Sequence, residues 1–225
     1  MPRRILPFVT GEIYHIFNRT INKIPVFTKF RINQRLMISL SFYRFTNLSV
    51  SLSRFLTWDK DRQEEVLNSS EGGKKIRVNI LGFCLMPNHY HLLCRQEQGG
   101  GISKFVSQLQ NSFTRYYNLK RQKKGYLFEG QFRAVRIEDD QQLLHVSRYI
   151  HLNPYTSFVV KTFDELGNYP LSSLSEYLTA RKGFCQTEIV AAFFKNPASY
   201  KRFLADQADY QRNLEKIKHL VVEGA

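Results

Sequence analysis

The strongest constraint on the fold of this chain comes from two apolar runs, at residues 76–85 and 89–95. The first run begins with strict alternation of apolar and polar side chains and then becomes wholly apolar. This pattern is typical of a strand that passes from the edge of a sheet into its core. Met86-Pro87-Asn88 interrupts the pattern and marks a turn, so the sequence predicts two strands paired antiparallel.

Two histidines, His89 and His91, lie one residue apart in the second run. Side chains alternate along a strand, so both imidazoles are expected on one face, about 7 Å apart. Imidazole is the commonest protein ligand for divalent metals, and two adjacent imidazoles need only one or two further donors. The alternative is structural, with one histidine closing the turn after Pro87 and the other hydrogen-bonded in the core. The motif alone does not separate these two interpretations.

The charge of the chain indicates a polyanionic partner. Lys and Arg outnumber Asp and Glu by 33 to 19, which gives a formal charge of +14. Such an excess favours nucleic acid first and an anionic membrane second. With 225 residues, 43% of them hydrophobic, the chain can form one ordinary globular domain with a small appendage.

The sequence contains no feature of a membrane or secreted protein. No window approaches 18 consecutive apolar residues, and the N-terminus lacks the apolar core of a signal peptide. Cys84, Cys94 and Cys185 are widely spaced and odd in number, which argues against a disulfide framework or a cysteine zinc site. We therefore expect a cytoplasmic protein with reduced cysteines.

The remaining periodicities predict further strands and helices around this pair of strands. Residues 46–75 are less regular and predict an insertion with a short helix near 61–67 and a loop at 69–75. After residue 160 the composition changes, and we expect a mostly helical C-terminal extension over 161–225 that follows a first domain over 1–160. The other predicted elements are a strand at 12–19, helices at 33–43 and 102–121, a strand ending at 137, and a helix at 139–152 that ends at Asn153-Pro154.

The last of these helices carries a polar stripe. His145, Tyr149 and Asn153 are spaced by four residues and so share one face. Facing the two histidines, the Asn153 side-chain oxygen would be a third metal donor beside a phenol. The alternative makes Tyr149 a partly buried structural residue and Asn153 a C-cap before proline. The spacing alone favours this structural alternative.

An ordered set of motifs resembles the REP-associated tyrosine transposases, which belong to the single-tyrosine HUH superfamily (histidine, hydrophobic residue, histidine). Tyr14-His15 to Asn18-Arg19 resembles the N-terminal strand of that family, and the similarity extends from about Gly11 to Val160. The other motifs are Met-Pro-Asn-His-Tyr-His-Leu-Leu at 86–93, Arg-Tyr-Tyr-Asn at 115–118, Phe-Glu-Gly-Gln-Phe-Arg at 128–133 and Tyr-Ile-His-Leu-Asn-Pro at 149–154.

The resemblance implies an α+β fold, a ferredoxin-like antiparallel sheet flanked by helices. It implies a single-strand DNA endonuclease and strand transferase that depends on Mg²⁺ or Mn²⁺ and acts on hairpin-forming repeats, as a monomer or homodimer. Tyr149 would be the nucleophile that forms a 5′-phosphotyrosine, with His89, His91 and Asn153 as metal ligands. Tyr90 stands where the family usually has an aliphatic residue, and we expect it to point away from the metal.

Basic side chains interleaved with aromatic ones are expected to contact DNA, since cations reach phosphates and rings stack on unpaired bases. The basic set is Arg19, Lys23, Arg115, Lys120, Arg121, Lys123, Lys124, Arg133 and Arg136, and the aromatic set includes Phe17, Phe27, Phe30, Tyr117, Tyr126 and Phe128.

Two other classes of function remain open. One is a nucleic-acid-binding module of the same fold that does not cleave. The other is an RNase or phosphodiesterase that uses activated water. His145 or Arg148 could help to deprotonate Tyr149, although a structural role is favoured for His145.

Overall fold

The computed structural model describes residues 7–46, 48–72, 76–179 and 183–223. Residues 1–6, where the sequence lacks the apolar core of a signal peptide, lie outside this range. So do residues 73–75 of the predicted loop. No helix among the described residues is long and apolar enough to cross a membrane.

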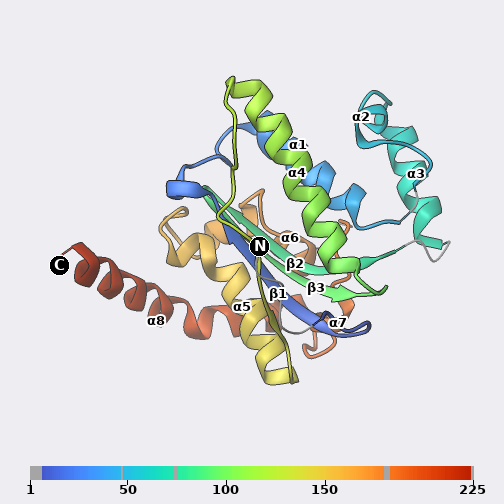
Figure 1. The fold of residues 1–225 in the computed structure, drawn as a ribbon. Helices are drawn as coiled ribbons and strands as arrows, with labels where there is room; N and C mark the ends of the chain where they lie inside the picture. Colours follow the sequence, from blue (N-terminus) through green and yellow to red (C-terminus); the bar gives the residue numbers. More distant parts are fainter. Residues whose placement is uncertain (1–6, 47, 73–75, 180–182, 224–225) are drawn as a thin grey trace.

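A four-stranded antiparallel sheet forms the centre of the fold (Figure 1). Its strands lie in the order β2-β3-β1-β4, and every neighbouring pair is antiparallel. The chain order β-α-β-β-α-β and this strand order make a ferredoxin-like sheet, so the predicted fold class is confirmed. The elements are β1 (Ile13–Arg19), α1 (Phe30–Tyr43), β2 (Val78–Met86), β3 (His89–Gln96), α4 (Gly101–Arg121) and β4 (Arg133–Arg136).

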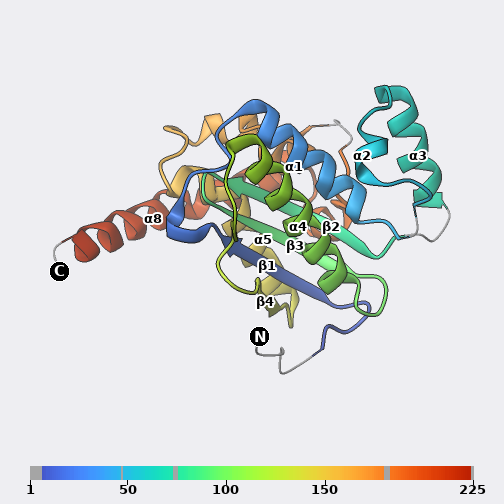
Figure 2. The same ribbon diagram turned by 45° about the horizontal axis from the view of Figure 1, so that its top comes forward.

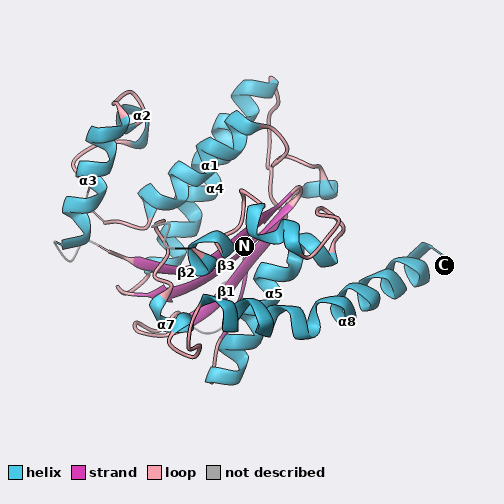
Figure 3. Cartoon of the chain, turned by 180° about the vertical axis from the view of Figure 1, so that it is seen from behind, coloured by secondary structure: helices cyan, strands magenta, loops and turns pink. Residues whose placement is uncertain are grey.

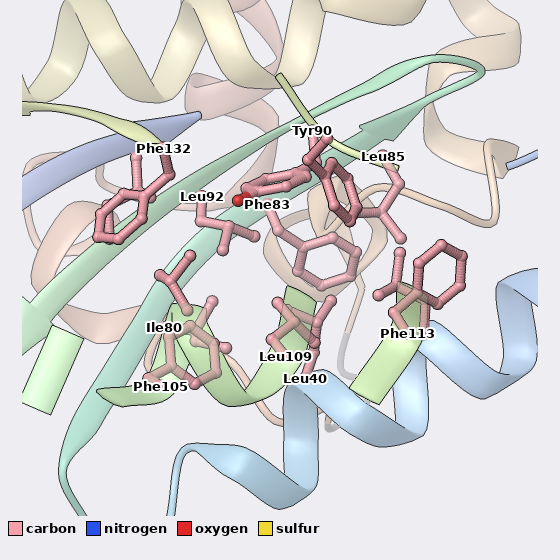
Figure 4. Packing of buried hydrophobic residues seen from close by; sticks show 14 of the residues in the cluster. Leu40, Ile80, Phe83, Leu85, Tyr90, Leu92, Phe105, Leu109, Phe113 and Phe132 are labelled. Atoms are coloured by element: carbon pink, nitrogen blue, oxygen red, sulfur yellow. The ribbon is translucent and has the colours of Figure 1, made fainter. Parts of the chain in front are cut away.

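Helices α1 and α4 lie side by side on one face of the sheet (Figure 2). The buried stripe of α4, which includes Phe105, Leu109 and Phe113, packs against Ile80 and Leu92 of the sheet, and Leu40 of α1 joins the same cluster (Figure 4). Each of these side chains is at most 2% exposed. Burying such residues stabilises the fold by about 1.5–3 kcal/mol for each side chain.

The helical stripe of α4 differs from the predicted one at its end. Steps of three and four residues from Leu109 through Phe113 predict Tyr116 as the next core residue, but Tyr117 is the buried one, at 5% exposure, and Tyr116 is only partly buried. Phe27 and Phe128 are buried in the same cluster as Tyr117. These three rings therefore cannot stack on DNA bases.

Helices from the C-terminal third cover the other face of the sheet (Figure 3). They form a second buried cluster with Leu81, Cys84 and Leu93. With both faces covered, all nine residues of β2 are buried, so the predicted passage into the core is confirmed. These helices are α5 (Asp140–Thr156), α6 (Leu174–Leu178), α7 (Glu188–Ala191) and α8 (Pro197–Glu223), with a 3-10 turn η2 (Asp164–Asn168).

The predicted end of α5 at Asn153-Pro154 is wrong, because the helix continues to Thr156 with Pro154 inside it. A proline inside a helix costs about 3 kcal/mol through a lost hydrogen bond and a clash. Here residues 150–156 are all buried. The carbonyl of Pro154 also accepts from the N–H groups of Val159 and Val160, at 2.9 and 3.0 Å. Tertiary packing therefore outweighs the local preference of proline.

The segment after α5 also covers the free edge of β2. The Leu85 N–H donates to the carbonyl of Leu171 at 2.8 Å, and the Ser173 N–H donates to the carbonyl of Phe83 at 3.0 Å. A bulge between Ile80 and Gly82 interrupts the register of β2 with β3, and Gly82 lies against Ser173 of this segment. An otherwise open sheet edge is thus paired within the chain.

Residues in the predicted insertion form two helices, α2 (Leu52–Phe55) and α3 (Lys60–Gly72), which stand apart from the sheet in all views (Figures 1–3). Helix α3 is longer than the predicted short helix at 61–67. Leu52 and Phe55 bury against Phe42 of α1 in a small cluster of their own.

A buried hydrogen-bond network holds α5 to α8. His151 Nδ1 lies 2.6 Å from the hydroxyl of Tyr200, and His151 Nε2 lies 2.8 Å from Ser173 Oγ. Burial lowers the pKa of His151 to about 3. Beyond this network, Tyr155 donates to Asp209 at 2.7 Å, and Leu204 is fully buried. Helix α8 therefore supports α5 from behind.

The stability of the fold is expected to fall as the pH drops through this network. An unfolded His151 binds a proton near pH 6.5, but the folded state resists protonation down to about pH 3. Between these values the unfolded state binds more protons, so the free energy of unfolding decreases with falling pH, by about 2 kcal/mol from pH 7 to pH 5. Urea unfolding of the wild type and of His151→Gln at pH 7 and pH 5 measures the contribution of His151 to this decrease. An equal decrease in the free energy of unfolding of both proteins would contradict the prediction.

Candidate active site

The two histidines project from the start of β3, next to the Pro87-Asn88 turn. The N–H of Phe27 donates to the carbonyl of Pro87 at 3.0 Å, and the N–H of Thr20 donates to that of Asn88 at 2.8 Å. The turn is thus tied to the segment after β1. The imidazole rings of His89 and His91 lie on the same face of the sheet, as the sequence predicts. Their centroids are 5.1 Å apart, closer than the expected separation of about 7 Å, and the rings are nearly perpendicular.

Tyr149 comes to this face from α5. Its ring packs edge-on against the imidazole of His91, with centroids 5.2 Å apart. The side chain is 37% exposed, so it also meets solvent. The structure therefore brings the predicted nucleophile against a predicted metal ligand, although 58 residues separate them in the chain.

Asn153 lies one helical turn after Tyr149 and is 3% exposed. It lies close enough to His89 to raise the pKa of that imidazole. Because α5 continues past Pro154, Asn153 is a helical residue and shares the face of Tyr149. The four predicted site residues His89, His91, Tyr149 and Asn153 thus form one cluster.

Only one other tyrosine lines this site, and its hydroxyl is engaged elsewhere. Tyr90 points to the opposite face of the sheet, where Gln110 Nε2 donates to its hydroxyl at 2.9 Å. Burial raises the pKa of that phenol above its ordinary value. Tyr117 is buried in the cluster under α4, and Tyr126 is 83% exposed away from the cavity. The geometry therefore selects Tyr149 among the tyrosines.

Burial dominates the electrostatics of the histidines. It holds the pKa of His91 well below the ordinary value, with smaller contributions from His15 and His89. The pKa of His89 is also lowered, chiefly by burial and further by the nearby charge of Arg19, while the side chain of Asn153 opposes this. Both imidazoles are therefore neutral at neutral pH, which is the form that binds metals.

One buried atom indicates how the cluster fits a metal ion. His91 Nε2 is buried and has no hydrogen-bond partner among the described residues. Such orphaned groups are rare and call for an explanation, and a metal ligand is one. No three His, Cys, Asp or Glu side chains within the described ranges are arranged to hold a metal ion. A metal here would therefore use His89, His91 and the amide oxygen of Asn153.

A cavity of about 580 Å³ opens beside these residues. Arg19 and Arg133 lie at this cavity, and Arg19 forms an exposed ion pair with Glu129 (Nε to Oε2, 2.5 Å). Asn18 also lines the cavity, and its buried Nδ2 lacks a partner among the described residues. The full lining is Phe17, Asn18, Arg19, His89, Tyr90, His91, Glu129, Gly130, Gln131, Arg133 and Tyr149.

The other predicted DNA-binding residues lie away from this cavity. Arg136 is paired with Glu12 across β4 and β1, at 2.9 Å. Lys23 is exposed near the turn, where Asn88 donates to its carbonyl at 3.2 Å. The remaining five are exposed on α4 or directly after it: Arg115, Lys120, Arg121, Lys123 and Lys124.

The structure separates His145 and Arg148 from Tyr149. Both line a different cavity of about 560 Å³, together with Phe203 of α8. The guanidinium of Arg148 stacks on the Phe203 ring, 4.3 Å from its centre. Neither side chain lines the cavity that contains Tyr149. The suggestion that they help to deprotonate this phenol therefore has no support in the geometry.

Sequence reasoning did not assign a role to His15. Its Nε2 lies 3.0 Å from His91 Nδ1, and its ring lies 6.0 Å from that of Tyr149. The available signal was the alternation in β1, which puts His15 on the same face as Phe17 and Arg19. No local sequence pattern indicates that this face lies next to the histidines of β3, because His15 and His91 are 76 residues apart in the sequence.

Comparisons with known proteins give one family match and a structural match. Residues 50–153 match the sequence model of a family described as "Transposase IS200 like". A solved structure of a REP-associated tyrosine transposase bound to a REP hairpin has the same fold, with a TM-score of 0.54 and 15% sequence identity. The match covers 80% of this chain and 87% of that one. No curated protein matches the chain at a significant level. Residues 50–153 are therefore similar to the IS200-like transposases, and the chain has the fold of a REP-associated tyrosine transposase.

Proposed function

We propose that this protein is a metal-dependent, single-strand-specific DNA endonuclease and strand transferase that acts through a covalent 5′-phosphotyrosine. The observation that carries the proposal is the contact between the Tyr149 ring and His91, beside His89 and Asn153, at an open cavity. A phenol next to a pair of neutral imidazoles with an amide fits metal-assisted nucleophilic attack better than it fits a purely structural cluster.

The proposed reaction forms one phosphorus–oxygen bond for each one that it breaks. The Tyr149 oxygen attacks phosphorus, a bond from Oη to phosphorus forms, and the bond from phosphorus to the 3′ oxygen breaks. The phenolic proton leaves Tyr149, and a proton reaches the departing 3′ oxygen, so the products are a 5′-phosphotyrosine and a free 3′-OH. Attack by a 3′-OH reverses the step and joins strands. No nucleotide cofactor is needed, because one phosphodiester replaces another.

Other residues near Tyr149 would bind the metal, orient the tyrosine ring and contact the DNA. His89, His91 and Asn153 would hold a Mg²⁺ or Mn²⁺ ion, which supplies Lewis-acid stabilisation of charge on the non-bridging phosphate oxygens when bound. Packing against His91 orients the Tyr149 ring. Arg19 can contact a phosphate, since an exposed ion pair such as that with Glu129 is worth little and is easily exchanged.

The DNA partner is proposed to be a hairpin-forming repeat with a single-stranded flank. The related structure contains a REP hairpin, and the present chain has the same fold and a charge of +14. Exposed Phe30 and Tyr126, at 79% and 83% exposure, are available for stacking on unpaired bases. The exposed cations on and after α4 can contact phosphates.

A denaturing gel tests the proposal. The protein is incubated with Mg²⁺ or Mn²⁺ and single-stranded oligonucleotides from hairpin repeats that flank its own gene. We expect a protein–DNA adduct that survives denaturation and requires the metal. Cleavage without an adduct would indicate activated water, as in an RNase or phosphodiesterase. Binding of a cognate repeat without cleavage or adduct would favour a nucleic-acid-binding module.

Replacing Arg19 by Ala is expected to weaken single-stranded DNA binding and reduce its salt dependence. Loss of one phosphate contact lowers the slope of log K against log salt concentration by about 0.7 for single strands. Fluorescence anisotropy over a salt series measures the slope. Arg54→Ala is the matched control, because Arg54 is exposed on α2, which stands apart from the sheet. Equal slopes for the two variants would exclude Arg19 as a phosphate contact.

A further inference from the structure

His15 is a half-buried, titratable side chain beside His91 and Tyr149 to which the proposed mechanism gives no role. It projects from β1, which pairs with β3 so that Phe17 lies opposite His91. Its ring packs 5.0 Å from Phe17, 5.2 Å from His91 and 6.0 Å from Tyr149. The side chain thus contacts both the predicted ligand and the predicted nucleophile.

The hydrogen bond between the two imidazoles has two possible proton arrangements. His15 Nε2 lies 3.0 Å from His91 Nδ1, and both are ring nitrogens, so one must donate and the other accept. If His15 donated, the proton of neutral His91 would sit on Nε2, the buried atom without a partner. A buried N–H group without an acceptor is rarer and costlier than a buried lone pair. The geometry therefore favours donation from His91 Nδ1 to His15 Nε2.

We propose that His15 is a positioning residue that accepts the hydrogen bond from His91 Nδ1 and so keeps the Nε2 lone pair of His91 free to bind metal. The role rests on the metal site of the proposed function. Metal-binding histidines commonly donate their second ring N–H to a neighbouring acceptor, which fixes both the tautomer and the ring orientation.

The neighbouring histidine is held in the same way. His89 Nδ1 lies 2.7 Å from Asn88 Oδ1, an acceptor only, so the proton of neutral His89 is on Nδ1 and its Nε2 carries the lone pair. Both imidazoles are therefore anchored through Nδ1, His89 by the turn and His91 by β1.

Nitrogen NMR of the metal-free protein tests the tautomer directly. With ¹⁵N-labelled histidine at neutral pH, we expect the proton of His91 on Nδ1 in the wild type. In His15→Phe, which keeps a ring of similar size but removes the acceptor, we expect His91 to shift to the Nε2–H form that imidazole prefers in water. Finding the proton of wild-type His91 on Nε2 would overturn the proposal, whatever the variants do.

Metal affinity provides the second readout. Titration with Mn²⁺, followed by the loss of its free EPR signal, is expected to show an affinity about 10- to 100-fold lower in His15→Phe than in the wild type. In His15→Gln, an amide oxygen reaches about as far along the side chain as Nε2 and can accept the hydrogen bond, so most of the affinity should return. His145→Phe makes the same change outside the cavity and should bind as the wild type does.

The outcomes separate this role from the proposed function. If the wild type binds Mn²⁺ and His15→Phe binds it equally well, His15 does not position the ligand, although the metal site stands. If the wild type binds no Mn²⁺ but His91 carries its proton on Nδ1, the metal part of the proposed function fails while the hydrogen-bond assignment survives. A loss of affinity that His15→Gln does not restore would reduce His15 to a packing role and overturn the proposal.

Discussion

Replacing Tyr149 by Phe is expected to abolish the covalent protein–DNA adduct and to lower DNA cleavage by at least about 10⁴-fold, a loss of the size seen when an enzyme loses its covalent nucleophile. The phenyl ring keeps the packing against His91, and only the hydroxyl is removed. DNA binding should remain near the wild-type level, because phosphates are contacted by cations and not by this phenol. The measurement is a single-turnover cleavage assay with a denaturing gel.

Tyr126→Phe is the matched control for this experiment. Tyr126 is 83% exposed and lies outside the cavity, so the same loss of a hydroxyl should leave cleavage and the adduct unchanged. A persistent adduct in Tyr149→Phe would show that another residue is the nucleophile. Residual cleavage without any adduct in both the variant and the wild type would assign the reaction to water.

Replacing His91 by Ala is expected to lower cleavage by roughly 10³-fold and to abolish the response to Mn²⁺. Lewis-acid stabilisation by a metal is worth several kcal/mol, and each 1.36 kcal/mol corresponds to a factor of ten in rate. In the proposed site two imidazoles and one amide hold the ion, so the loss of His91 leaves two of the three protein ligands. Cleavage rates across a Mn²⁺ titration, with circular dichroism to verify folding, provide the measurement.

His145→Ala controls for the loss of a histidine near the active helix. This exposed side chain lies on α5, one turn before Tyr149, but lines the other cavity. Its removal should leave both cleavage and Mn²⁺ dependence intact. Wild-type cleavage that continues unchanged after removal of divalent metal, together with full activity of His91→Ala, would refute the metal-dependent mechanism.

Local periodicity predicts part of the site directly from the sequence. Alternation in a strand puts His89 and His91 on one face, and four-residue spacing in a helix puts Asn153 on the face of Tyr149. The hairpin around Pro87-Asn88 follows from turn chemistry between two apolar runs. These relations hold wherever the elements pack, because backbone geometry alone sets them.

Composition identified basic residues as a class but could not locate them. Of the nine basic residues predicted to bind DNA, Arg19 and Arg133 line the cavity, and Arg136 is paired with Glu12. The choice of Tyr116 over Tyr117 for the core also failed, since residues next to each other on a helix differ by only part of a turn. Side-chain environment depends on neighbours that periodicity does not specify.

Packing between distant segments sets which faces of the strands and helices meet. It brought Tyr149 against His91 and placed His15 within hydrogen-bond distance of the same ring, across 76 residues of chain. It also explains why α5 continues past Pro154. Burial of this part of the helix against the sheet and α8 outweighs the cost of about 3 kcal/mol of a proline inside a helix. Packing between distant segments sums many small contacts, and that sum is absent from any short window of sequence.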